Sequence, residues 1–197
     1  MYDKLNLILT YFSPAISFVL ITVLLLFQIF KKRLPSLKIL GIIIKIFISF
    51  LIIFAFFLSF INYFAWKNND VSQRLLPPYA SIAYVLHYSW QHYFFAPIVT
   101  IIFALIVFWG IKSLNKKFNN TFFYDEEPYL AALGILATGW PNCLIYLCSV
   151  LFLGVTAHFI IQKGRLPLLY FWLPCALLVL LLSGIISKYI TINQLVI

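Results

Sequence analysis

Charged residues are scarce in this sequence. Only 10% of the 197 residues are charged and five are acidic, whereas 64% are hydrophobic. Soluble domains contain about 45–50% apolar residues, so the composition excludes an ordinary soluble fold and indicates a polytopic membrane protein. Apolar runs long enough to cross a hydrocarbon core of about 30 Å take up most of the sequence and leave no room for a separate soluble domain.

Metal-binding and disulfide-forming residues are also few. Cys143, Cys148 and Cys175 all lie in apolar runs, and an odd, buried set is a poor disulfide framework, so we interpret them as small hydrophobic residues. His87 and His92 are five positions apart, which is about 140° around a helix, so they do not form the i, i+4 pair of a helical metal site. The sequence therefore predicts neither a metal site nor a cofactor.

The net charge of +9 comes from basic residues in short connections between apolar runs, which are typical topology signals and do not indicate nucleic-acid binding. If alternate connections lie on the same side of the membrane, nine basic residues fall on one side and four on the other. The positive-inside rule assigns the larger group to the cytoplasm and predicts that both termini lie outside. Frequent Ile, Phe, Lys and Asn suggest a bacterial protein of the cytoplasmic membrane. The larger group contains Lys31, Lys32, Arg33, Lys38, Lys112, Lys116, Lys117, Lys163 and Arg165, and the smaller one Lys4, Lys67, Arg74 and Lys188.

We expect an all-α bundle that forms one integral-membrane domain with six transmembrane spans. The Tyr- and Trp-rich segment 71–92 is expected to lie at the outer interface. The turn Gly139-Trp140-Pro141 is expected below the outer surface, where irregular backbone must pack against protein or water. The lipid headgroups are the expected location of five basic residues, Lys31, Lys32, Arg33, Lys116 and Lys117. The predicted spans are 7–30, 39–66, 94–111, 126–138, 142–161 and 168–186.

Three consecutive acids, Asp125, Glu126 and Glu127, directly precede the fourth apolar run. Carboxylates at a helix N-terminus complement the helix dipole. They could form a binding site at one membrane face, or they could be a helix cap with a solvated charge cluster. The acids alone leave both interpretations open.

The segments around these acids resemble the C-terminal half of the type IV prepilin peptidases, membrane aspartyl proteases of the GxGD type. The resemblance rests on the LAALG run Leu130–Gly134, the turn Gly139–Pro141 and the basic loop Lys163–Pro167, with a second match in FQIFKKRLP at Phe27–Pro35. Counting along these motifs places one family aspartate at Glu126 and the other at Gln28. The two motif glycines fall on Phe123 and Asp125, and the motif lysine on Pro128.

These departures from the family pattern argue against proteolysis. An aspartyl dyad needs two carboxyls that share a proton, and the amide of Gln28 cannot ionise. The longer side chain of Glu126 displaces its carboxyl, and a misplacement of about 1 Å can cost on the order of 100-fold in rate. The resemblance therefore implies a non-catalytic relative.

The resemblance also implies helical membrane partners such as pilin-type segments, with Asp125, Glu126 and Glu127 facing a basic juxtamembrane stretch. Two alternatives stay open. One is an active membrane protease that uses Glu126. The other is a small transporter or scaffold unrelated to peptidases, although the spans carry few ionisable residues, mainly Lys45 and His158, and intramembrane charge usually marks an ion pathway.

Overall fold

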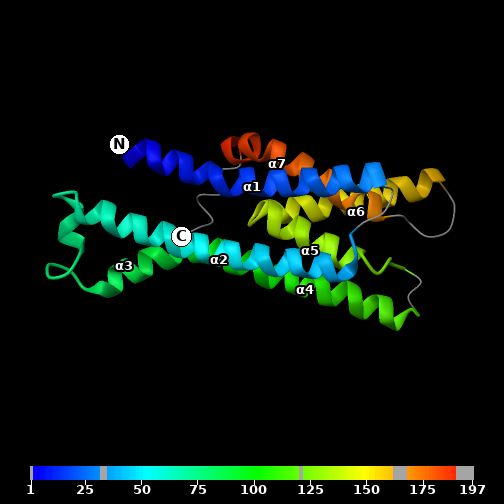
Figure 1. The fold of residues 1–197 in the computed structure, drawn as a ribbon, viewed down its shortest axis with the longest axis horizontal. Coiled ribbons are helices and arrows are strands. Elements are labelled where there is room, and N and C mark those ends of the chain that lie inside the picture. The colour runs from blue at the N-terminus through cyan, green and yellow to red at the C-terminus, as the bar shows by residue number, and fades with distance from the viewer. Residues whose placement is uncertain (1, 32–34, 120–121, 162–167, 190–197) are drawn as a thin grey trace.

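The protein folds into a set of long helices (Figure 1). The computed structural model describes residues 2–31, 35–119, 122–161 and 168–189, and the side chains of residues 12–30, 35–119, 122–157, 159 and 168–183. No strand occurs in these ranges, so the all-helical prediction is confirmed for the described part of the chain. The elements are α1 (Tyr2–Lys31), α2 (Leu37–Lys67), η1 (Ser72–Leu75), α3 (Ile82–Ser89), the π-helix η2 (Trp90–Phe94), α4 (Phe95–Lys117), α5 (Glu127–Thr138), α6 (Asn142–Ile161), η3 (Leu168–Tyr170) and α7 (Trp172–Tyr189).

The long helices run alternately in opposite directions. Helices α1, α4 and α6 run toward the right-hand end of Figure 1, and α2, α5 and α7 run back from it. Three helical stretches are long and apolar enough to cross a membrane, namely Phe12–Phe30, Leu37–Lys67 and Ile82–Lys117. Helix α5 has 12 residues, and the apolar stretches Asn142–Ala157 and Leu168–Ser183 also fall short of the span length. Six spans therefore stay a prediction.

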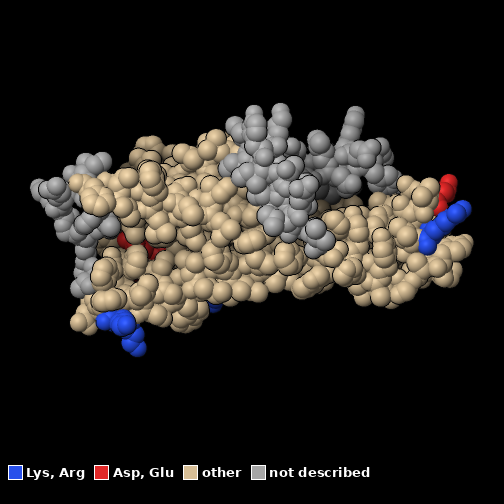
Figure 2. Space-filling view, turned by 180° about the vertical axis from the view of Figure 1, so that it is seen from behind, with Lys and Arg blue, Asp and Glu red and all other residues tan. Residues whose placement is uncertain are grey.

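The surface of the bundle is apolar along its length. Large hydrophobic side chains such as Ile53, Phe56 and Phe60 of α2 are more than half exposed. Figure 2 shows most of the charged side chains near the two ends of the molecule, with a long, largely uncharged belt between them. An apolar belt bounded by charge is the arrangement that a lipid bilayer favours.

The segment before α4 differs from the expected interfacial stretch 71–92. A helix begins at Ile82, and α3, η2 and α4 form a single apolar stretch, Ile82–Lys117. The side chain of Ser81 caps it by accepting a hydrogen bond of 3.1 Å from the amide of Ala83, which satisfies a free donor of the first turn. The wide turn of η2 ends three residues before Pro97, which has no amide hydrogen to donate. Residues 82–92 therefore lie in the same apolar helical stretch as α4, and the location of segment 71–92 at the outer interface stays a prediction.

Helix α5 is the centre of the molecule. Eleven of its 12 residues are buried, and only Tyr129 is partly exposed. Five helices, α1, α2, α4, α6 and α7, pack around it. Its small residues Ala131, Ala132, Gly134 and Ala137 let the neighbouring helices approach closely, because membrane helices associate through packing of small side chains.

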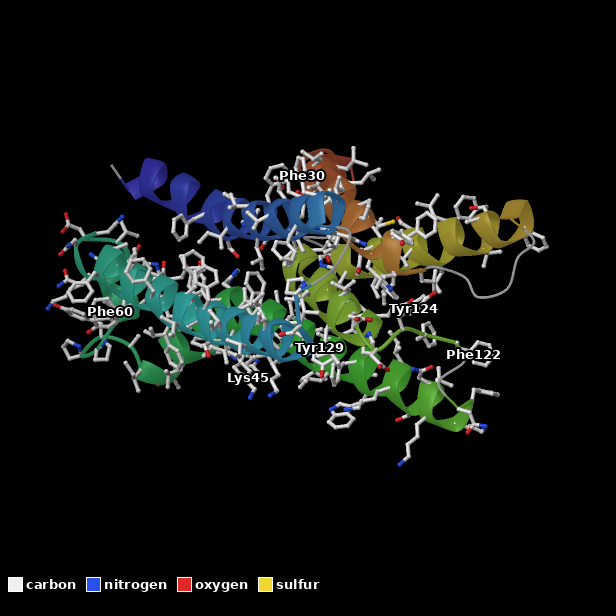
Figure 3. All side chains as sticks on the ribbon, turned by 45° about the vertical axis from the view of Figure 1, so that its right-hand side comes forward. Phe30, Lys45, Phe60, Phe122, Tyr124 and Tyr129 are labelled. Carbon is white, nitrogen blue, oxygen red and sulfur yellow. The ribbon has the colours of Figure 1, made fainter. Side chains whose placement is uncertain are left out.

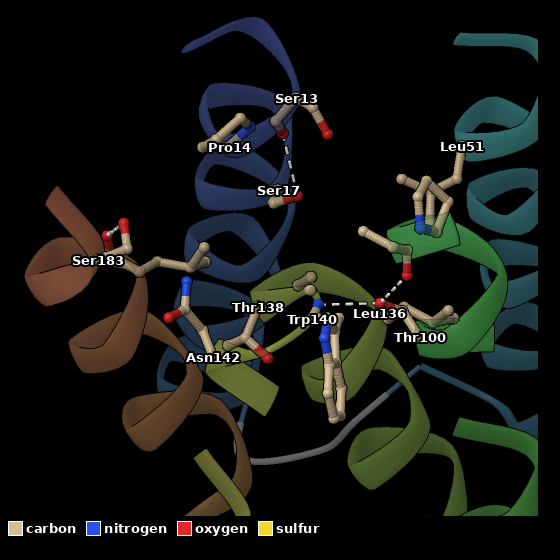
Figure 4. A pocket seen from close by; sticks show the side chains of 15 residues that line it. Ser13, Pro14, Ser17, Leu51, Thr100, Leu136, Thr138, Trp140, Asn142 and Ser183 are labelled. Carbon is tan, nitrogen blue, oxygen red and sulfur yellow. Dashed lines mark hydrogen bonds between the residues drawn. The ribbon is translucent and has the colours of Figure 1, made fainter. Parts of the chain in front are cut away.

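The turn between α5 and α6 is half-buried. Gly139 has a φ of 69°, a conformation that residues with a Cβ rarely adopt. The amide of Gly139 donates to the carbonyl of Ile135 at 3.0 Å, and the amide of Trp140 donates to Oγ1 of Thr100 in α4 at 2.9 Å (Figure 4). These bonds satisfy two amides of the irregular backbone, as a turn below the membrane surface would require, and that depth stays a prediction.

Gly134 gives a test of this packing. A methyl group at position 134 would collide with the phenol of Tyr146 in α6, whereas one at Gly110 in α4 would meet nothing within 4 Å. Overpacking of this kind costs about 1–3 kcal/mol, so Gly134→Ala should lower the melting temperature of the detergent-solubilised protein by several degrees, as followed by circular dichroism. Gly110→Ala is the matched control and should not lower it. Equal melting of the two variants would contradict the close approach of α5 and α6.

Candidate functional site

The three consecutive acids lie at the beginning of α5, in three different environments. Asp125 is exposed, Glu126 is partly buried, and Glu127 has no exposed surface. Glu126 precedes the helix, and its carbonyl accepts the amides of Tyr129 and Leu130 at 3.1 Å each. Figure 2 shows acidic side chains recessed in a hollow near the end of the molecule at which α5 begins. The cluster thus divides into two acids that reach the surface and one that points into the bundle.

Glu127 is a buried acid with few partners. Its Oε2 accepts a hydrogen bond of 3.4 Å from the indole Nε1 of Trp172, and its Oε1 has no partner. Glu127 lies outside the three candidate spans. Burial raises the pKa of Glu127 to about 7, although hydrogen bonds from Trp172 and from the backbone at Tyr124 and Leu169 lower it in part.

Gln28, near the end of α1, reaches the same segment. Its Nε2 donates to the carbonyl of Leu169 at 3.3 Å, and its Oε1 is buried without a partner. Leu169 lies three residues before Trp172, so residues 169–172 connect Gln28 on one side to Glu127 on the other. The ring of Trp172 also lies 6.2 Å from that of Tyr146, whose buried phenol oxygen has no hydrogen-bond partner.

The motif count assigns the two family aspartates to Gln28 and Glu126, whereas in the structure Gln28 bonds to Leu169 and Glu127 bonds to Trp172 in the same segment. Glu126, the position obtained by counting along the motif, instead lies at the boundary of the helix. Trp172, Leu169 and Tyr146 were not singled out from the sequence, because nothing in an apolar run distinguishes a residue that packs from one that holds a polar group.

Asn115 is a further residue that the sequence did not indicate. It is buried near the end of α4, where its Nδ2 donates to the carbonyl of Phe123 at 3.0 Å and its Oδ1 accepts the amide of Phe123 at 3.1 Å. This two-way bond holds the acidic segment against α4. The buried residues Thr100, Ala104 and Ile111 precede it on one face of α4, and this spacing is a signal that could have revealed it.

The expected headgroup contacts lie partly outside the described residues. The side chains of Lys31, Lys32 and Arg33 are not among those described, and Lys116 and Lys117 are exposed in the last turn of α4. His87 and His92 are both exposed. Among the residues that the structure describes, no group of three or more His, Cys, Asp and Glu side chains could hold a metal ion.

A cavity of about 250 Å³, with polar and apolar lining residues, adjoins the turn between α5 and α6 (Figure 4). Three of its hydroxyls donate to carbonyls of their own helices, at 3.0 Å from Ser17, 2.8 Å from Thr138 and 2.6 Å from Ser183. Their oxygens can still accept hydrogen bonds, and a water fills about 30 Å³, so the cavity suits several waters. No titratable side chain is among the described residues that line it. Its polar lining consists of Ser13, Ser17, Thr100, Thr138, Asn142 and Ser183.

Among the described acids, Glu127 is buried and accepts a hydrogen bond from the indole of Trp172, Asp125 and Glu126 lie beside it toward the surface, and Asp70 lies in the connection after α2. No described carboxyl is hydrogen-bonded to Glu127, whose Oε1 has no partner. A general-acid pair needs a second carboxyl that shares the proton. The arrangement is therefore a buried, partly satisfied polar cluster beneath an exposed acidic rim.

The raised pKa of Glu127 leads to a pH test. Its proton should be lost near pH 7 and not near the ordinary 4.5, and infrared difference spectra should show loss of a carboxyl C=O band with this midpoint. Because the folded protein holds the proton more tightly, stability should fall as the pH rises from about 4.5 to about 7. Glu127→Gln should remove both effects.

Glu126→Gln is the matched control, because that side chain reaches the surface. This variant should keep the infrared band and the pH dependence of stability. A wild-type spectrum in which all carboxyls titrate near pH 4.5 would show that Glu127 is hydrated.

Comparison with protein-family models, with curated proteins and with solved structures gives no match for this chain. The resemblance to the prepilin peptidases therefore stands on the motifs quoted above and on no wider similarity. Functional conclusions rest on the residues and on the geometry of the site.

Proposed function

We propose that this protein is a non-catalytic, prepilin-peptidase-like protein of the bacterial cytoplasmic membrane that binds helical membrane segments of pilin type. The observation that carries the proposal is the approach of Gln28 and Glu127 to residues 169–172, from helices that are 96 or more residues apart along the chain. The family resemblance expects its two aspartates at these two helix ends. The alternating directions of the helices also agree with a six-span bundle.

The loss of catalysis follows from the chemistry of the pair. The amide of Gln28 donates to Leu169 and has no proton to exchange near neutral pH. Glu127 is bound to an indole, which donates but does not accept. No second carboxyl among the described residues is positioned to share its proton, so activation of water has no acid and base partner.

The rim of the site suits a basic, partly apolar segment. Asp125 is exposed, and the side chains of Phe122 and Tyr124 beside it are 54% and 41% exposed (Figure 3). Exposed aromatic residues together with acids fit the junction of an apolar helix and a positively charged stretch. Glu127 is buried and cannot touch such a partner directly, so Asp125 and Glu126 make the charged contacts.

The transporter alternative has one observation in its favour. The cavity beside the turn of Gly139 lies between antiparallel helices, and small-molecule sites often lie between the helices of bundles. The absence of titratable groups among its described lining residues weakens it. Ser17→Cys, in a background without native cysteines, tests for a water pathway. If a membrane-impermeant thiol reagent does not modify this cysteine from either side, a water pathway is excluded.

A crosslinking experiment tests partner binding. A photoreactive residue at Tyr124 should crosslink to a synthetic single-span peptide with a basic juxtamembrane stretch, and much less to a peptide with a neutral stretch. The double variant Asp125→Asn, Glu126→Gln should lower the yield several-fold, because each exposed pair contributes about 0.2–1 kcal/mol, and added salt should do the same.

The control places the photoreactive residue at Tyr79, which is 72% exposed in the connection before α3 and should not crosslink. Equal yields with the basic and neutral peptides would refute the proposed recognition. Cleavage of the peptide that disappears in Glu126→Gln would instead support the active protease.

A further inference from the structure

A second surface, separate from the acidic site, is hollowed between α2 and α4. This groove has a volume of about 620 Å³, within the range of about 300–1,000 Å³ that small-ligand sites occupy. Helix α5 forms its floor through Tyr129, Ala132 and Leu136. The hollow exists because Gly41 on α2 and Ala104 on α4 leave room between the two helices.

Two lysines border this apolar groove. Lys38 and Lys45 both line it and both are exposed, and their spacing of seven residues, about two helical turns, puts them on one side of α2. Neither has an ion-pair partner among the described residues. Lys45 lies about 12 Å along the helix from Leu37, so its ammonium is set into an otherwise apolar span (Figure 3).

The opposite wall, formed by α4, also carries a cation next to an aromatic ring. Nζ of Lys112 on α4 lies 5.9 Å from the ring of Phe108, which lines the groove. Tyr129 on the floor packs edge-on against Phe108, with 5.1 Å between the ring centres. One end of the groove is therefore positively charged on both sides, while the rest of its surface is mainly apolar.

We propose that this groove binds an anionic phospholipid, with an acyl chain along α5 and the phosphate between Lys38 and Lys45. A lysine within a span is costly unless its ammonium meets an anion or the headgroup layer, and a lipid phosphate supplies that anion. A partner helix with an apolar surface would leave both ammonium groups unpaired. The proposal concerns a different surface from the acidic rim and does not depend on partner binding there.

Native mass spectrometry of the detergent-solubilised protein tests the charged part of this site. Phosphatidylglycerol should bind more tightly than phosphatidylcholine with the same acyl chains. Each lysine near a membrane surface contributes about 1 kcal/mol toward anionic lipid, so Lys38→Gln with Lys45→Gln should reduce the phosphatidylglycerol preference by about 30-fold. The matched control, Lys67→Gln with Arg74→Gln at the other end of α2, should leave the preference unchanged.

Two further variants test the apolar part. A side chain at position 41 begins in ordinary contact, 3.7 Å from Cε1 of Tyr129, so Gly41→Leu should fill the groove and remove bound lipid of both kinds. Leu105→Trp, at an exposed lining position, should have the same effect if Gly41→Leu fails to fold. Equal binding of the two lipids by the wild type would overturn the proposal. Lipid binding that survives both groove variants would also overturn the proposal. So would a protein dimer that these variants dissociate while lipid binding persists.

Discussion

The burial of α5 on all sides is the constraint on which the rest of the structure depends. A helix surrounded by five others needs small residues where they meet, and Gly134 provides this for Tyr146. A buried helix must also have its ends satisfied. Asn115 holds the segment that precedes α5, and Oγ1 of Thr100 accepts a hydrogen bond from the turn that follows α5. Helix α4 therefore anchors α5 at both ends, and the position of Glu127 follows from that anchoring.

The same constraint explains why a carboxyl is kept inside an apolar bundle. Glu127 begins a helix whose next residues are all needed for packing, so its side chain is directed inward against α7. The indole of Trp172 satisfies only one carboxyl oxygen, and burying a charge without full compensation is costly. A raised pKa is the physical result, because the neutral acid is easier to bury.

The sequence predicted the broad fold well and the site only in outline. Apolar composition and long runs were enough to predict helices, and Gly139 was a clear break. Run length alone could not show that the 12-residue α5 would be buried among the other helices, because a buried helix and a span are both uniformly apolar. The resemblance assigned the family aspartates to Gln28 and Glu126, and this assignment stays a prediction, while Glu127 is the acid that is buried in the bundle. Successive residues of a helix point about 100° apart around its axis. The packing around α5 therefore determines which acid points inward.

The short helix α5 also contributes to both of the surfaces for which we propose a ligand. At its beginning, α5 brings the acidic rim close to the end of α1, and this rim suits a positively charged segment. Along one side, Ala132 and Leu136 form a shallow floor between α2 and α4, and lysines gather at that opening. The two surfaces have opposite charge and lie on different sides of the same helix. An acidic partner site and a basic lipid site can therefore be occupied together, because neither ligand needs the residues of the other.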